Sequence, residues 1–113
     1  MTRVLVTGAS GFIGRPLCVA LAAAGHTVRA ALRDRRVQGF PPGVEIVRLP
    51  DLAGPVDWAP LVDSMDAVVH LAAIAHAPPD VPDAAYERVN HMATAEFARA
   101  AAAADIGRFV FIS

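Results

Sequence analysis

The feature that most constrains this chain is the stretch VTGASGFIG, residues 6–14, which continues an apolar run that begins at Val4. Its three glycines, Gly8, Gly11 and Gly14, are spaced three residues apart. Glycine loses more backbone entropy on folding than any other residue, so a cluster this dense needs a physical reason. Two interpretations are open: a surface turn built from small residues, or a loop that lets a ligand approach bare backbone.

The pattern of apolar segments places this loop between a strand and a helix. Short β-branched and apolar runs predict strands, and longer amphipathic or alanine-rich runs predict helices. The predicted strands are 3–7, 28–32, 44–48, 67–71 and 108–112, and the predicted helices are 12–24, 56–64 and 83–104. The strands are apolar on both faces, which is typical of a parallel sheet covered by helices on both sides. A length of 113 residues fits one domain with its own core.

A glycine loop between a strand and a helix is the usual setting of a phosphate cradle. In that setting Gly8 permits the tight turn, Gly11 leaves room for a pyrophosphate against the backbone, and Gly14 lets the helix pack closely. The first turn of the helix adds unpaired N–H groups and a partial positive charge. The candidate cofactor-binding residues of this loop are Gly8, Ser10, Gly11, Phe12, Ile13 and Gly14.

The stretch VTGASGFIG also resembles the cofactor loop of the extended short-chain dehydrogenase/reductase family, which includes nucleotide-sugar epimerases and dehydratases. Further stretches resemble that family in order along the chain: GHTVRAALRD, LPDLAG, VVHLAA, RVNHMATAEFARAA and RFVFIS. The resemblance covers essentially all 113 residues. It implies a Rossmann-type, doubly wound parallel sheet with five strands in the order 3-2-1-4-5, truncated after strand five, and a bound NAD or NADP.

The end of the second predicted strand bears on the choice between NAD and NADP. Leu32 occupies the position where NAD-specific relatives carry an acidic residue, and Arg33 follows it. The planar guanidinium of an arginine suits the 2′-phosphate of NADP. Asp34 lies at the general spacing of the acidic residue that binds a ribose 2′-OH, which favours NAD instead. We favour NADP. The alternative is that the arginines of this turn form only a solvated surface.

The resemblance assigns further residues to the cofactor site. It implies that Asp51 meets the adenine amino group and that Leu52 packs against the adenine ring, although Asp51 is also an ordinary turn residue. Leu71, Ala72 and Ala73 would pass beneath the nicotinamide, where small residues permit close approach; ordinary packing at a strand end is the alternative. Asn90 resembles an asparagine that supports the active-site end of the long helix.

The catalytic pair of the family is absent from these residues. The resemblance implies a tyrosine followed four positions later by a lysine, whereas the single tyrosine, Tyr86, is followed by Asn90 and the chain contains no lysine. The family's catalytic serine or threonine would fall just after Ser113, which is itself a weak candidate. We therefore interpret residues 1–113 as an incomplete dinucleotide-binding domain without its substrate-binding part, and we expect it to be inactive alone.

Three functional hypotheses follow from these observations. The first is the cofactor-binding part of an epimerase or dehydratase that acts on a nucleotide sugar. The second is an NADP-dependent ketone reductase of the same superfamily. The third is a non-catalytic dinucleotide-binding sensor or scaffold, for which the absence of the tyrosine–lysine pair would be native. The last strand would form an exposed sheet edge, which allows a homodimer.

Composition argues against several other classes. A net charge of −1 does not suit a nucleic-acid surface, and no apolar run approaches the length of a membrane span. The single Cys18 cannot form an internal disulfide, and the N-terminus lacks a signal-peptide pattern, so we expect a cytoplasmic location. His70, His76 and His91 have irregular spacing and lack accompanying ligands, so we predict no metal site.

Overall fold

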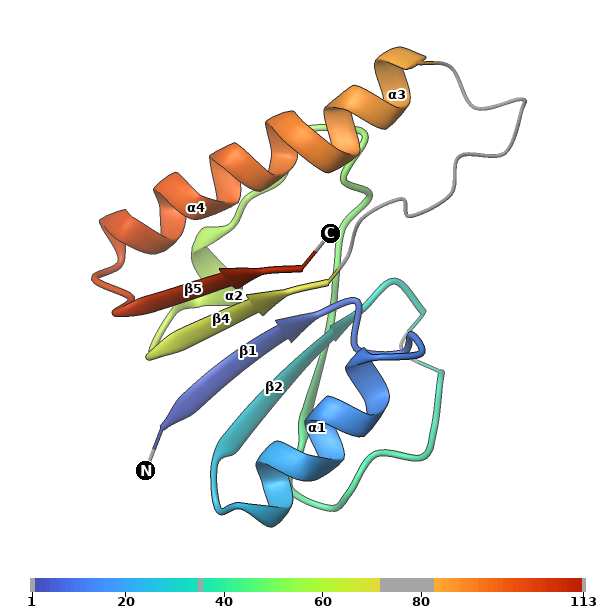
Figure 1. The fold of residues 1–113 in the computed structure, drawn as a ribbon, viewed down its shortest axis with the longest axis vertical. Helices are drawn as coiled ribbons and strands as arrows, with labels where there is room; N and C mark the ends of the chain where they lie inside the picture. Colours follow the sequence, from blue (N-terminus) through green and yellow to red (C-terminus); the bar gives the residue numbers. More distant parts are fainter. Residues whose placement is uncertain (1, 35, 72–82, 113) are drawn as a thin grey trace.

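The strands form one parallel sheet with helices on both faces, and a helix separates each pair of successive strands except β2 and β3 (Figure 1). The structure is a computed structural model that describes residues 2–34, 36–71 and 83–112. Its strands are β1 (Arg3–Thr7), β2 (Thr27–Leu32), β3 (Glu45–Arg48), β4 (Ala67–His70) and β5 (Arg108–Phe111). Its helices are α1 (Gly14–Ala23), α2 (Ala59–Val62), α3 (Asp83–Glu87), the π-helical turn η1 (Arg88–Met92) and α4 (Ala93–Ala103).

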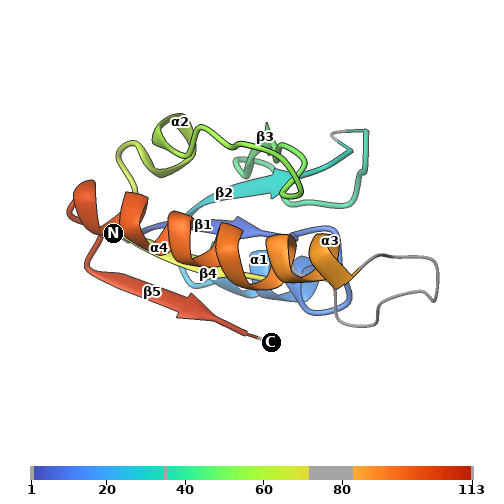
Figure 2. The ribbon, with the colours of Figure 1, turned by 90° about the horizontal axis from the view of Figure 1, so that it is seen from above.

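The strand order is β3-β2-β1-β4-β5, and every neighbouring pair is parallel. Figure 2 shows the strands in this order from one margin of the sheet to the other. The predicted α/β fold and the strand order 3-2-1-4-5 are confirmed. Because all strands run in one direction, the residues that follow β1, β2 and β4 gather at the same edge of the sheet. In open α/β sheets this edge is where ligands bind, at the point where the strand order reverses.

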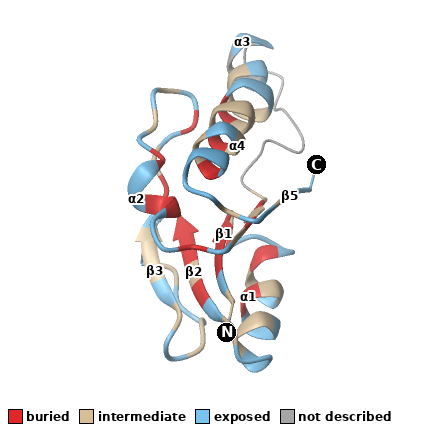
Figure 3. Ribbon diagram, turned by 90° about the vertical axis from the view of Figure 1, so that its left-hand side faces the viewer, coloured by how far each residue is buried: buried red, intermediate tan, exposed pale blue. Residues whose placement is uncertain are grey.

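Alternation along the strands divides the core into two clusters. Leu5 of β1 and Val68 of β4 face α4, where they pack with Phe97 and with Trp58, which precedes α2. Val4 and Val6 face α1, and Cys18 is buried with them; these residues define the second cluster. Figure 3 shows buried positions along β1 and β2 and in α4, and these residues are shared between the two clusters on opposite faces of the sheet. Burial on both faces is what the uninterrupted apolar strands predict.

The first helix begins later than the sequence suggests. We expected a helix from residue 12, with Phe12 and Ile13 on its apolar face, but α1 begins at Gly14 and the Phe12 side chain is 97% exposed. Phe12 and Ile13 instead belong to the loop, so their assignment to the apolar face is wrong. Pro16 lies in the first turn of α1, where its missing N–H costs no hydrogen bond.

The long helix predicted over residues 83–104 is broken by a π-helical turn. Asp83 is the first residue of α3, and η1 separates α3 from α4. Such turns are rare and are found frequently at functional sites. The predicted helix at 56–64 shortens to α2, whose first turn contains a proline. No helix among the described residues is long and apolar enough to cross a membrane.

Candidate dinucleotide site

The glycine loop turns sharply out of β1 and closes against its own backbone. Gly8 has a φ of 67°, a conformation that glycine adopts without steric cost, and the Gly11 N–H donates to the Gly8 carbonyl at 3.1 Å. A Cβ on Gly14 would lie 2.3 Å from the Gly8 oxygen and 2.7 Å from the Ala9 Cα. The close approach that we expected of Gly14 is therefore present, but its partner is the loop backbone.

Within the described residues, no side chain caps the amide groups at the start of α1. Ile13 stands at the N-cap position without a side-chain hydrogen bond. In the part of the chain that the structure describes, the amide N–H groups of Phe12 and Ile13 donate to no backbone or side-chain acceptor. Gly11, Phe12 and Ile13 are all exposed, as is Ser10. Exposed, uncapped amides at a helix N-terminus form a binding site for an anion such as a pyrophosphate.

A buried pair of polar side chains lies directly below this loop. Thr7 and His70 end β1 and β4, are register partners, and are both fully buried. The Thr7 Oγ1 lies 2.6 Å from the His70 Nδ1 and accepts a hydrogen bond from the Leu71 N–H at 3.1 Å. The same N–H lies 3.2 Å from the Thr7 carbonyl oxygen. The pair therefore fastens the ends of the two central strands together beside the glycine loop.

Burial keeps His70 neutral. It lowers the pKa of the imidazole to about 4, because the charged form would lose its hydration. The ring packs against Phe97 in an edge-to-face arrangement, with centroids 5.1 Å apart, and against Phe111 at 5.6 Å. Among the described residues, the buried His70 Nε2 has no hydrogen-bond partner. A neutral imidazole in an aromatic environment suits a structural role at the site better than proton transfer.

A basic hollow opens beyond the ends of β2 and β3. Its volume is about 730 Å³, and its lining residues are Arg33, Asp34, Arg36, Ile46 and Arg48. Asp34 is engaged within the turn, since its carboxylate accepts hydrogen bonds from the Arg36 backbone N–H and guanidinium at 3.0 Å each. Arg36 thereby lowers the pKa of Asp34. Three arginines and one carboxylate leave the hollow with a net positive charge.

The turn after β3 holds the two residues expected to meet the adenine. Asp51 is exposed, and its Oδ1 accepts a hydrogen bond from the Ala53 N–H at 3.0 Å. Leu52 is only 6% exposed and packs in the core on the α4 side. Any contact between Leu52 and an adenine ring would therefore use the small surface that this side chain leaves open.

The remaining predicted residues are placed as follows. Leu71 is half-buried next to the glycine loop, and Asn90 is half-buried in η1, where it makes an interaction of its own. Ala72, Ala73 and Ser113 lie outside the described residues. Their expected roles at the nicotinamide and at the catalytic centre stay predictions.

Three features of the site were not predicted from the sequence: the Thr7–His70 pair, the contribution of Arg48 to the basic hollow, and a contact between Arg88 and the turn after β3. The first was accessible in principle, because both residues end strands that are neighbours in the predicted order. Arg48 ends β3 in the same way. Arg88 carried no signal, since its contact depends on the conformation of a loop 34 residues away.

Cysteine and metal chemistry receive no support from the described residues. Burial raises the pKa of the Cys18 thiol to about 11, so this side chain is not a nucleophile at neutral pH. Within the described ranges, no group of three or more His, Cys, Asp or Glu side chains could hold a metal ion.

Comparison with known proteins agrees with this geometry. Residues 4–113 match the model of the NAD dependent epimerase/dehydratase family. A 2-alkyl-3-oxoalkanoate reductase from Stenotrophomonas maltophilia is 36% identical over 111 residues, which are 98% of this chain and 33% of the reductase. The chain thus spans about a third of the length of this curated relative.

Solved structures resemble the fold over the whole chain. Uronate dehydrogenase from Agrobacterium tumefaciens superposes with a TM-score of 0.78 at 30% identity, covering 100% of this chain and 41% of the enzyme. UDP-glucuronic acid 4-epimerase from Bacillus cereus, solved in complex with NAD, gives a TM-score of 0.77 at 28% identity, covering 99% of this chain and 40% of the epimerase. That complex holds NAD and lends no support to the expected preference for NADP. Together with the family match over nearly all its residues, these likenesses confirm the expected resemblance: the chain belongs to the NAD-dependent epimerase/dehydratase family.

Proposed function

We propose that this chain is the dinucleotide-binding part of an oxidoreductase that moves hydride between a substrate carbon and a nicotinamide. The observation that carries the proposal is the pair of exposed, uncapped amides of Phe12 and Ile13 at the start of α1. They lie beside a glycine loop in which a Cβ on Gly14 would collide with backbone. This arrangement suits a pyrophosphate and is left unexplained by a purely structural turn.

The chain's own residues would bind and orient the cofactor. When bound, the nicotinamide ring supplies the hydride chemistry. The amides of Phe12 and Ile13 would hold the pyrophosphate, and Asp51 would accept a hydrogen bond from the adenine amino group. Thr7 and His70 would fix the end of β4, so that the backbone from Leu71 onward, with Ala72 and Ala73, approaches the nicotinamide. Asn90 would support the same end of the site from η1.

We further propose that NADP binds more tightly than NAD. Arg33 and Arg48 line a hollow beyond the ends of β2 and β3, where the 2′-phosphate of NADP would lie. Asp34, the acid among the described residues that line this hollow, is already paired with Arg36. The NAD found with the epimerase of Bacillus cereus speaks for the alternative, so this choice needs its own measurement.

The substrate class follows from the relatives. Similarity to uronate dehydrogenase and to UDP-glucuronic acid 4-epimerase favours a sugar substrate, and a nucleotide sugar is our first candidate. The second is a ketone, because the 2-alkyl-3-oxoalkanoate reductase is 36% identical and because a basic hollow for NADP suits a reductase. A ketone would take up hydride at its carbonyl carbon, whereas an epimerase would remove and return hydride at a carbinol carbon.

The substrate-binding part and the catalytic tyrosine–lysine pair would lie outside these 113 residues, since the chain contains no lysine. The 113-residue chain should therefore bind a dinucleotide without turning over a nucleotide sugar or a ketone. Measurable turnover would contradict the proposal that the catalytic residues lie outside this chain. If the chain supports no reaction even as part of a longer polypeptide, that result would favour the sensor or scaffold hypothesis.

Calorimetric titration of the chain with NADPH and NADH tests the binding proposal. We expect NADPH to bind about tenfold more tightly, as one charge-assisted contact contributes roughly 1.5 kcal/mol or more. Arg33→Ala should bring the two affinities together. Arg108→Ala, which changes an exposed arginine at the start of β5, serves as the control and should leave the ratio unchanged. Failure of both dinucleotides to bind would overturn the proposed function, and an unchanged ratio in Arg33→Ala would overturn the role of Arg33.

A further inference from the structure

The turn after β3 is closed mainly by short-range bonds. The Asp51 side chain accepts from the Ala53 N–H at 3.0 Å, and the Asp51 carbonyl accepts from the Gly54 N–H at 3.3 Å. These bonds shape the turn but do not fix it relative to the rest of the fold. Leu52 anchors one side of the turn in the core. The far side, at Gly54, is held by a different element.

That element is η1, through the side chain of its first residue. The Arg88 Nη2 donates to the Gly54 carbonyl at 2.7 Å. The other edge of the guanidinium is held by Glu96 of α4, with Nη1 to Oε1 at 2.7 Å and Nη2 to Oε2 at 3.2 Å. A carboxylate bound at two points fixes the plane of the guanidinium, which a lysine ammonium could not reproduce. Arg88 is therefore oriented by Glu96 before it reaches Gly54.

This contact joins two parts of the proposed cofactor site. Arg88 opens the π-helical turn that carries Asn90, and Gly54 belongs to the turn that presents Asp51. Arg88, Glu96 and residues 53–56 also line a hollow of about 320 Å³ beside that turn. Leu52 holds one side of the turn in the core, so it is the position of the other side, at Gly54, that depends on Arg88.

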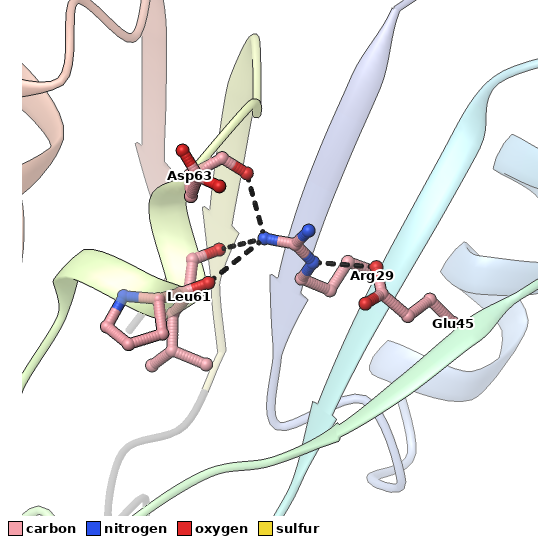
Figure 4. Close-up of polar contacts among 5 residues, drawn as sticks. Arg29, Glu45, Leu61 and Asp63 are labelled. Carbon is pink, nitrogen blue, oxygen red and sulfur yellow. Dashed lines mark hydrogen bonds and ion pairs between the residues drawn. The ribbon is translucent and has the colours of Figure 1, made fainter.

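A second arginine makes chemically similar contacts elsewhere and provides a control. The Arg29 Nη1 donates to the carbonyls of Leu61 and Asp63 at 2.8 and 3.0 Å, and its Nε donates to Glu45 at 2.8 Å (Figure 4). These carbonyls lie at and beyond the end of α2, where helical carbonyls lack partners within the helix. Arg29 thus pairs with one carboxylate, as Arg88 does, and with three backbone carbonyls where Arg88 has one, and it holds α2 to β2 and β3.

We propose that Arg88 is a positioning residue for the adenine end of the dinucleotide. By holding the Gly54 carbonyl, it fixes the turn from which the Asp51 carboxylate meets the adenine amino group. This inference rests on the proposed function and deepens it. It assigns recognition of the base to a residue that does not touch the base.

The test compares two dinucleotides that differ only in the base. Adenine offers an amino group to Asp51, whereas hypoxanthine places a carbonyl oxygen there, which the carboxylate repels. We expect the wild-type chain to bind NADP about tenfold more tightly than its hypoxanthine analogue, since one hydrogen bond to a charged group is lost. Arg88→Met should reduce this ratio to near one, and Arg88→Lys should give an intermediate value.

The ratio of the two affinities separates a positioning effect of Arg88 from a loss of stability, because partial unfolding weakens the binding of both dinucleotides equally. Arg29→Met should lower the Tm and leave the ratio at its wild-type value. If Arg88→Met does not fold, Arg88→Lys and Glu96→Gln apply the same test, and both should reduce the ratio.

The outcomes distinguish the two proposals. Binding of neither dinucleotide by the wild-type chain overturns the proposed function and, with it, this inference. Tight binding without a preference for adenine, or a preference that survives in the folded Arg88 variants, overturns the role of Arg88 alone.

Discussion

The ends of β1 and β2 lie next to each other in the sheet but are held in different ways. After β1, the glycine loop is fixed by backbone contacts, with Ala9 and Gly14 buried and no space for a Cβ at Gly14. After β2, the turn containing Arg33 and Asp34 is exposed, and its order comes from side-chain bonds within the turn. One region is defined by steric exclusion and the other by charge.

This difference indicates how the two regions would share the work of binding. A loop fixed by backbone packing presents its amides in one geometry at any ionic strength. A solvent-exposed group of charges adjusts to its ligand and is screened by salt. We therefore expect the glycine loop to supply the common affinity for a diphosphate, and the arginine turn to supply the discrimination between dinucleotides.

The largest effect should come from Gly14→Ala. The new Cβ would lie within 3.0 Å of three backbone atoms, so the loop or the first turn of α1 must shift. Forced overpacking of this kind costs about 3 kcal/mol. We expect a loss of stability of that size in chemical denaturation, together with loss of dinucleotide binding.

Gly107→Ala is the matched control for this substitution. A Cβ there would come no closer than 3.9 Å to the Asp66 carbonyl oxygen, an ordinary contact. Its stability and its affinity for NADPH should remain near the wild-type values. Equal stability of the Gly14 and Gly107 variants would show that the glycine loop is not sterically defined, and the comparison between the two regions would fail.

The features that could be predicted from the sequence are those set by local sterics and burial, as in the first region. The features set by side-chain contacts, as in the second region, could not. The glycine loop and the strand order were predictable, because glycine spacing and apolar strands act through local sterics and burial. The start of α1 was not, since it depends on how closely Gly14 approaches the Gly8 carbonyl. The pairing of Asp34 with Arg36 and the reach of Arg88 to Gly54 depend on side-chain and loop conformations that no spacing rule specifies.

The next largest effect should come from His70, which is buried below the glycine loop. It should appear as a pH dependence of the free energy of unfolding. The pKa of His70 is about 4 in the folded chain, against about 6.5 when unfolded. Between these values the unfolded chain binds more protons, so stability should rise as the pH increases from 4 to 6.5 and level off above that range. The contribution of His70 over this window is up to about 3 kcal/mol.

Urea denaturation at several pH values, compared between the wild-type chain and His70→Asn, isolates this contribution. All other ionisable groups are common to the two proteins, so only the difference between the two profiles matters. The profile of the variant should be flatter between pH 4 and 6.5. Two parallel profiles would show that His70 takes up its proton without cost, contrary to its burial.

A smaller effect should follow from changing the acid in the arginine turn. Asp34 is ionised at neutral pH, because Arg36 lowers the pKa of its carboxyl group. Asp34→Asn would remove repulsion toward a 2′-phosphate, so NADPH should bind roughly fivefold more tightly. NADH should bind almost as before, and titration with both dinucleotides measures the two changes. A large loss of NADH affinity would instead show that Asp34 leaves Arg36 to bind the ribose, which would reverse the expected preference.

The smallest effect on stability should come from Arg36→Ala. The Arg36 side chain is 91% exposed, and its pair with Asp34 is screened by solvent, so removing it should leave the Tm within about 1 °C of the wild-type value. Its effect on binding is more informative, because it releases the Asp34 carboxylate from its partner while also removing a positive charge from the hollow. Both changes disfavour a 2′-phosphate and favour a 2′-OH, so the ratio of NADPH to NADH affinity should fall, while the affinity for ADP-ribose, which carries a 2′-OH and the diphosphate, should not decrease. A parallel loss of ADP-ribose affinity would mean that the arginine turn shapes the glycine loop as well, and that the two regions are not independent.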